Sequence, residues 1–120
     1  MAKDDYNYLV FKILTYLYGC YQRKFSFDKV AFYGKISDKV AEETLIDTLR
    51  FMTDEGLING LVFVRVWGNE YILASDIGDM SITSAGIRYL LNNDIMQALK
   101  KSILEGAPSA ILTLAKIVLA

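Results

Sequence analysis

Apolar residues recur at intervals of three and four through the first part of the chain. Between Asp4 and Cys20 this spacing places six of them on one side of a helix: Tyr6, Leu9, Val10, Ile13, Leu14 and Leu17. Residues three and four apart share a helix face, because one turn takes about 3.6 residues. The pattern therefore predicts a first helix with one buried side.

Two further helices are predicted before residue 56. The second is short, with Ser26 as its cap, Gly34 as its end, and apolar positions at Phe27, Val30, Ala31 and Tyr33. The third begins at a cap provided by Ser37 or Asp38 and ends at Gly56, which readily adopts the left-handed conformation that terminates helices. Its core-facing stripe is expected to be Ala41, Leu45, Thr48, Leu49 and Met52.

The period then changes from helical to alternating, which predicts a β-hairpin. Its strands are Leu61 to Trp67 and Glu70 to Leu73, with Gly68 and Asn69 as a two-residue turn. In that register Trp67 faces Glu70, and one apolar side is expected to be buried: Val62, Val64, Val66, Tyr71 and Leu73. The opposite, half-exposed side would carry Phe63, Arg65, Trp67, Glu70 and Ile72.

The rest of the chain predicts a short strand and three helices. Met80 to Ile82 form the strand, and Thr83 caps a helix whose apolar positions are Ile87, Leu90 and Leu91. Asn92 and Asn93 break this helix, and the next one follows Ile95, Leu99 and Ile103. Gly106, Ala107 and Pro108 interrupt again before a last helix from Ser109 to Ala120.

This order of elements looks like a winged helix-turn-helix, an α+β fold with a three-helix core and a hairpin wing. The run from Leu49 to Ile58 is similar to the end of a recognition helix and the first wing strand, and Ile82 to Leu90 resembles the strand-to-helix step after the wing. With the tyrosine-rich first helix, the chain resembles the YjcQ family of small winged-helix proteins from Gram-positive bacteria and their phages. The resemblance covers roughly Tyr6 to Lys101 and implies a fold rather than an activity. We expect a winged-helix domain over residues 1–106 and an apolar helix over 107–120.

Composition limits the compartment and the partners. The chain has 120 residues and a net charge of -1, so only a local basic patch could attract a polyanion. The single cysteine, Cys20, cannot form an internal disulfide, which favours a reducing cytoplasm. The start of the chain lacks the features of a signal peptide, and the apolar run Ala107 to Ala120 falls short of the roughly 20 residues that span a bilayer. We therefore expect a cytoplasmic protein without a membrane anchor.

The sequence carries no recognisable catalytic, metal or cofactor motif. It has no histidine, which removes the commonest general base and zinc ligand. The neighbouring acids Glu42-Glu43 and Asp54-Glu55 point about 100° apart on a helix and do not clasp one atom. Phosphate-loop and dinucleotide glycine patterns are missing as well. We expect a non-enzymatic binding protein without metal or cofactor.

Double-stranded DNA is the first partner to consider. Between Tyr21 and Lys39 five basic residues stand against two acidic ones, a local balance of +3. The residues expected to contact DNA are Lys29, Lys35, Ser37, Lys39, Arg50 and Arg65. Against this, Asp38 to Glu55 contains six acids and two bases, which disfavours deep insertion of the third helix. The same basic residues are also compatible with an ordinary solubilising surface.

The last helix suggests a second kind of partner. Its apolar residues surround it almost completely, so it needs burial on two sides. It either docks within the monomer or forms a homodimer interface through Ile111, Leu112, Leu114, Ala115 and Val118. The alternative function is therefore a protein-interaction adaptor that uses the acidic third helix and this apolar helix. The sequence alone specifies neither a DNA sequence nor a protein partner.

Overall fold

The computed structural model describes residues 3–68, 70–106 and 110–119. These residues form a mostly helical α+β structure with two small antiparallel sheets. The helices are α1 (Lys3–Tyr21), α2 (Lys29–Ala31), the π-helix η1 (Phe32–Ile36), α3 (Glu42–Asp54), the 3-10 helix η2 (Ile77–Asp79), α4 (Ser84–Asn92), α5 (Asp94–Leu104) and α6 (Ala110–Val118). The strands are β1 (Ile58–Asn59), β2 (Phe63–Arg65), β3 (Tyr71–Leu73) and β4 (Ser81–Ile82).

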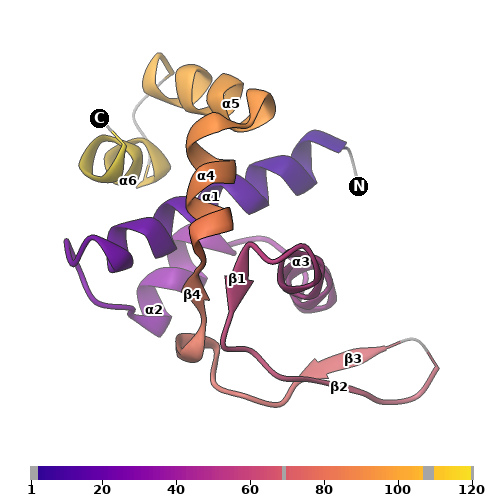
Figure 1. Ribbon diagram of the computed structural model, residues 1–120. Helices are drawn as coiled ribbons and strands as arrows, with labels where there is room; N and C mark the ends of the chain where they lie inside the picture. The colour runs from indigo at the N-terminus through magenta and orange to yellow at the C-terminus, as the bar shows by residue number, and fades with distance from the viewer. Residues whose placement is uncertain (1–2, 69, 107–109, 120) are drawn as a thin grey trace.

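Helix α1 lies at the centre of the core (Figure 1). It packs against α3 on one side and against α4, α5 and α6 on another. Val10, Ile13 and Leu14 are buried, as the three-and-four spacing predicts for one face. Because helices cover more than one side of α1, burial also extends to Phe11 and Thr15, which lie outside the predicted stripe.

The second helix differs from its prediction at both ends. Asp28, rather than Ser26, is the N-cap: its Oδ1 accepts a hydrogen bond of 3.1 Å from the Ala31 N–H. The helix also continues beyond Gly34 as η1, because the Ser37 N–H donates to the Phe32 carbonyl five residues earlier. This wider turn buries Phe32 and Ile36 and leaves Val30 and Tyr33 exposed, so the predicted apolar face was wrong.

Helix α3 begins later than predicted. Its N-cap is Ala41, with no side-chain hydrogen bond, so neither Ser37 nor Asp38 caps it. Ser37 is buried, and a turn in which Lys39 has a φ of 64° separates it from the helix. Ala41 is consequently exposed rather than in the core, whereas Leu45, Thr48, Leu49 and Met52 are buried as predicted.

The short strand β4 and the start of α4 confirm their predictions. β4 pairs antiparallel with β1, with Ile58 opposite Ile82. The Thr83 hydroxyl caps α4 by accepting from the Gly86 N–H at 2.9 Å. Gly56 has a φ of 77° directly after α3, as expected of the residue that ends it.

The hairpin forms, but its register differs by one residue from the predicted one. Phe63 pairs with Leu73 and Arg65 with Tyr71, and the Val66 N–H donates to the Glu70 carbonyl at 2.9 Å. The loop therefore has three residues, between Val66 and Glu70, whereas the prediction gave it two, between Trp67 and Glu70. Asn69 itself lies outside the described residues.

This shift reverses the expected faces of β2, because side chains alternate along a strand, whereas Tyr71 and Leu73 of β3 stay on the predicted inner side. The inner face carries Phe63, Arg65, Tyr71 and Leu73, and both Phe63 and Leu73 pack against the core. The predicted burial of Val62, Val64 and Val66 is wrong, since all three are exposed.

The last two helices of the prediction are present as α5 and α6. Asn93 accepts from the Ile95 and Met96 N–H groups and so caps α5, which agrees with the predicted interruption. Ala107, Pro108 and Ser109, and with them the predicted second break and the domain boundary, lie outside the described residues. Helix α6 packs against α1 and α5. In the part of the chain that the structure describes, no helix has both the length and the apolarity to cross a membrane.

Candidate interaction surface

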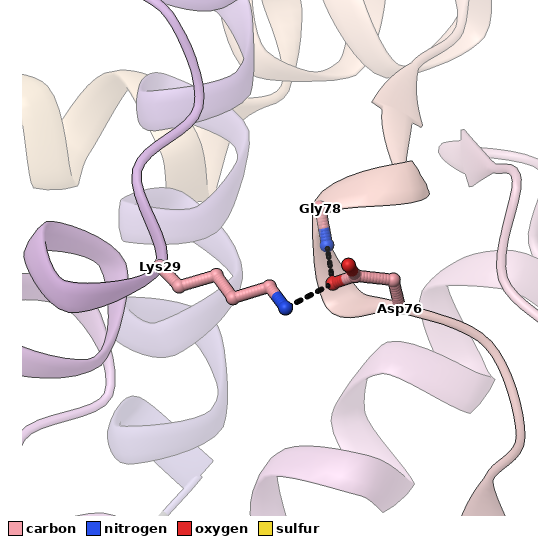
Figure 2. A network of polar contacts seen from close by, with 3 residues as sticks. All are labelled: Lys29, Asp76 and Gly78. Carbon is pink, nitrogen blue, oxygen red and sulfur yellow. Dashed lines mark hydrogen bonds and ion pairs between the residues drawn. The ribbon is translucent and has the colours of Figure 1, made fainter.

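The six residues predicted to contact DNA lie on four different segments of the chain. Lys29 and Lys35 lie on the α2–η1 segment, Ser37 and Lys39 in the turn before α3, Arg50 on α3 and Arg65 on β2. Lys29 is bonded to a distant loop, since its Nζ lies 2.9 Å from Asp76 Oδ1 (Figure 2). Its charge is therefore already paired within the chain.

Asp76 is held by two donors. Its carboxylate accepts from the Gly78 N–H at 3.0 Å, which caps η2, and from Lys29 (Figure 2). The Gly78 hydrogen bond, followed by the Lys29 one, lowers the pKa of Asp76 below its ordinary value. The bond to Asp76 raises the pKa of Lys29. Both side chains are exposed, so the ion pair contributes little to the stability of the fold.

Replacing Lys29 by methionine is expected to raise the pKa of Asp76 only part of the way to its ordinary value, because the Gly78 N–H is the larger cause and remains. The folded-state pKa lies below that of the unfolded chain, so the charged carboxylate stabilises the fold at neutral pH. This contribution is lost as the pH falls from the unfolded pKa through the folded one. A carbon-13 NMR titration of the Asp76 carboxyl measures the shift, with Lys101→Met as the control. A complete return to the ordinary pKa in Lys29→Met would contradict this ranking.

Ser37 and Lys39 border a cleft of about 400 Å³ between the turn before α3 and the hairpin. Ser37 is only 7% exposed and its N–H closes the π-turn, so its side chain is not accessible to a base edge. Lys39 is exposed, but Asp38 and Glu42 line the same cleft. In this part of the predicted DNA site, a phosphate would therefore meet the Lys39 ammonium with the carboxylates of Asp38 and Glu42 beside it.

Arg50 is turned onto the hairpin. Its guanidinium carbon lies 4.1 Å from the centre of the Tyr71 ring and 5.1 Å from that of Phe51. An ion pair of 3.7 Å with Asp47 also holds it. Arg65, the strand partner of Tyr71, is exposed, and its Nε donates to the Gly68 carbonyl at 2.8 Å. The structure thus brings Arg50 and Arg65 together around Tyr71, a residue that the sequence placed in the core.

The outer face of the hairpin is apolar and exposed. We define it by Val62, Val64, Val66, Ile72 and the adjacent Trp67. Their exposed fractions run from 38% for Val66 to 90% for Trp67. Single exposed apolar residues are common, but a contiguous group of this kind marks a contact surface. The one-residue register error hid this surface from the sequence argument.

An acidic stripe on α3 borders the hairpin. Glu43, Asp47 and Asp54 recur at intervals of four and seven and are exposed, and Arg50 lies on the same side of the helix. Because Arg50 reaches Tyr71, this stripe meets the hairpin along its inner edge. The stripe agrees with the predicted acidic face and would repel phosphate groups placed beside it.

The residues expected to form a dimer interface are covered mainly by their own chain. Ile111, Leu112, Ala115 and Val118 are buried in the monomer, and Leu114 is half-buried. Helix α6 is further tied by the Lys24 ammonium, which donates to the Ile117 carbonyl at 2.5 Å. A homodimer stays a prediction, but with α6 docked four of these five residues are inaccessible to a partner.

The remaining reactive group is Cys20 at the end of α1. Burial raises the pKa of its thiol, so less of the nucleophilic thiolate is present at neutral pH. Among the described residues no cluster of carboxylates or thiols is arranged to hold a metal ion.

Comparison with known proteins identifies a family but no individual relative. The model of the family described as YjcQ protein matches residues 11–105. No curated protein and no solved structure matches the chain significantly. The matched region includes the hairpin and the acidic stripe, and it ends before α6.

Proposed function

We propose that this chain, which belongs to the YjcQ family, acts without catalysis by binding another protein through its hairpin and α3. The observation that carries the proposal is the exposed apolar outer face with Trp67 at its edge. Indole side chains are strongly enriched among the residues that dominate protein–protein binding energy. A cytoplasmic location fits a chain whose single thiol has no disulfide partner.

The proposal includes a winged helix-turn-helix architecture. Three helical segments, α1, α2 with η1, and α3, precede β1, which pairs with β4. The β2–β3 hairpin lies between β1 and β4 in the chain and extends away from them (Figure 1). This order supports the reading of the hairpin as a wing. The fold is used for several kinds of binding, so the kind of partner depends on the surface rather than on the fold.

The surface favours a protein partner of defined chemistry. The outer face supplies an apolar patch without charge, whereas the neighbouring stripe of Glu43, Asp47 and Asp54 is negative. A complementary partner presents an apolar patch bordered by lysine or arginine side chains. This replaces the predicted role of the last helix, because α6 uses its apolar residues inside the chain.

Duplex DNA is the second candidate, because Lys35, Lys39 and Arg65 are exposed. In this case the wing would place Arg65 against the phosphate backbone. The support is weaker than for a protein, since Lys29 is paired and Arg50 stacks on Tyr71. The acidic stripe would also face the phosphates. A phage-related transcription regulator belongs to this second proposal.

The intrinsic fluorescence of Trp67 tests the first proposal directly. It is the only tryptophan of the chain and is 90% exposed, so a partner that covers it will shift the emission to shorter wavelength. Affinity capture from the source organism supplies candidates, each of which is then purified and titrated against the chain. We expect Trp67→Ala and Val64→Ser each to weaken binding about tenfold or more. Ile95→Ser, at an exposed apolar position on α5, serves as the matched control.

The same material distinguishes the two candidates. Anisotropy with a random-sequence duplex at low and at physiological salt is expected to show no salt-sensitive binding. If duplex DNA binds with a steep salt dependence that Lys35→Glu and Lys39→Glu flatten, the DNA proposal replaces the protein one. The protein proposal also fails if every purified partner binds Trp67→Ala as tightly as the original chain.

A further inference from the structure

A cavity of about 420 Å³ lies between the π-helix and the last helix, away from the hairpin. Its volume falls within the range of small-molecule sites. Two aromatic rings, Tyr16 and Phe25, line it, with their centres 5.1 Å apart. The aliphatic part of the lining comes from η1 and α6: Ile36, Ile111, Leu114 and Ile117.

The two charged residues of the lining differ in how they are engaged. Asp28 is occupied at the start of α2, where its Oδ1 accepts from the Ala31 N–H and its own N–H donates to the Tyr16 hydroxyl at 2.9 Å. Lys35 is exposed and has no ion-pair partner in the residues that the structure describes. The two residues are seven positions apart, about two helical turns. An anionic group would therefore be attracted to the Lys35 end and repelled from the Asp28 end.

The π-turn lies directly on this cavity. The Ser37 N–H donates to the Phe32 carbonyl at 3.2 Å, and Ala31, Lys35 and Ile36 from this segment all line the cavity. Such turns are rare and occur frequently at functional sites. The segment leads into the turn before α3, so an occupant of the cavity would contact the residues that position that helix.

We propose that this cavity binds a small amphipathic carboxylate, with its apolar body between Ile36 and the α6 side chains and its carboxylate at Lys35. The site is independent of the partner-binding surface on the hairpin. Its occupant would stabilise the docked position of α6, because Ile111, Leu114 and Ile117 belong to that helix.

Short- and medium-chain fatty acids are suitable probes. Butanoate, hexanoate and octanoate are titrated into the protein, and the methyl NMR signals of Ile36, Ile111, Leu114 and Ile117 are followed. We expect the affinity to rise about threefold to fourfold for each added methylene until the cavity is filled. Octylamine, which has the same chain but the opposite charge, is expected to bind more weakly than octanoate. The emission of Trp67 should stay unchanged, which separates this site from the hairpin.

Variants test the two halves of the site. Lys35→Met keeps the length of the side chain and is expected to weaken octanoate binding about fivefold while leaving 1-octanol binding unchanged. Lys101→Met, at an exposed lysine of α5, is the matched control and should bind octanoate normally. Ala31→Phe places a ring in the cavity and should reduce the binding of both probes, with circular dichroism showing that the helices remain. Equal octanoate affinity in Lys35→Met, or octanoate-induced shifts confined to other parts of the chain, would overturn the proposal.

Discussion

Replacing Gly60 by alanine is expected to lower the free energy of unfolding by about 3 kcal/mol. Gly60 follows β1 with a φ of 97°, a region that side chains with a Cβ rarely adopt. An added Cβ would also clash with the backbone carbonyl of Asp79. Because that carbonyl is a backbone group, no side-chain rotation can relieve the clash. Because Asp79 directly precedes Met80 and β4, relief of the clash would separate β1 from β4.

Two other glycines provide matched controls for this effect. Gly56 has a φ of 77° with nothing close to the added Cβ, so Gly56→Ala isolates the conformational cost of about 1–2 kcal/mol. Gly34 has open space and an ordinary φ, so Gly34→Ala should be neutral or stabilise by about 0.5 kcal/mol. Urea denaturation measures the free energy of unfolding of all three variants. The dependence of that free energy on urea concentration should be the same in each, which shows that the unfolding transition itself is unchanged. If Gly60→Ala costs no more than Gly56→Ala, the close approach of residue 60 to η2 is wrong.

The helices were predictable because their information is local. The spacing of Leu9, Ile13 and Leu17 fixes the buried side of α1 whatever packs against it. Thr83 and Asn93 cap the helices that follow them, since a short polar side chain bonds N–H groups two or three residues ahead. The late start of α3 was not predictable in this way, because burial of Ser37 depends on the π-turn before it.

The hairpin shows where local information ends. Val62, Val64 and Val66 alternate with Phe63 and Arg65 in either register, so alternation alone does not select the buried face. The choice depends on one extra residue in the loop and on packing of Phe63 and Leu73 against the core. Because of an error of one residue in the register, Val62, Val64 and Val66 were predicted to be buried, whereas they form the exposed apolar face of the hairpin.

The candidate site was predicted less well than the fold for a related reason. A count of charges along the chain does not reveal which of them are already engaged. Lys29 meets Asp76, and Arg50 meets Tyr71, across long stretches of sequence. Of the predicted set, Lys35 and Lys39 are exposed and have no ion pair among the described residues. The acidic stripe, by contrast, follows from helical spacing and was predictable.

Replacing Ala115 by glutamate is expected to detach α6 from the rest of the chain. Ala115 is completely buried where α6 packs on α1 and α5. The two helices approach closely: a Cβ on Gly19 of α1 would lie 2.9 Å from Val118 Cγ2. A carboxylate without a partner at such a position costs about 3 kcal/mol or more, which shifts the docking equilibrium by a factor of about one hundred. Trypsin cleavage after Lys116 reports the undocked fraction, because cleavage follows the population of the open form.

Thr113→Glu is the matched control, since it adds the same charge to an exposed position of the same helix and should leave the cleavage rate nearly unchanged. Detachment would uncover Ile111, Leu112 and Val118, the side chains first expected to join two copies. Light scattering on Ala115→Glu is therefore expected to show more self-association than light scattering on the unmodified chain. This outcome would mean that the apolar helix joins copies only when it leaves its own core. Unchanged trypsin cleavage in Ala115→Glu would instead show that α6 does not depend on this contact for its position.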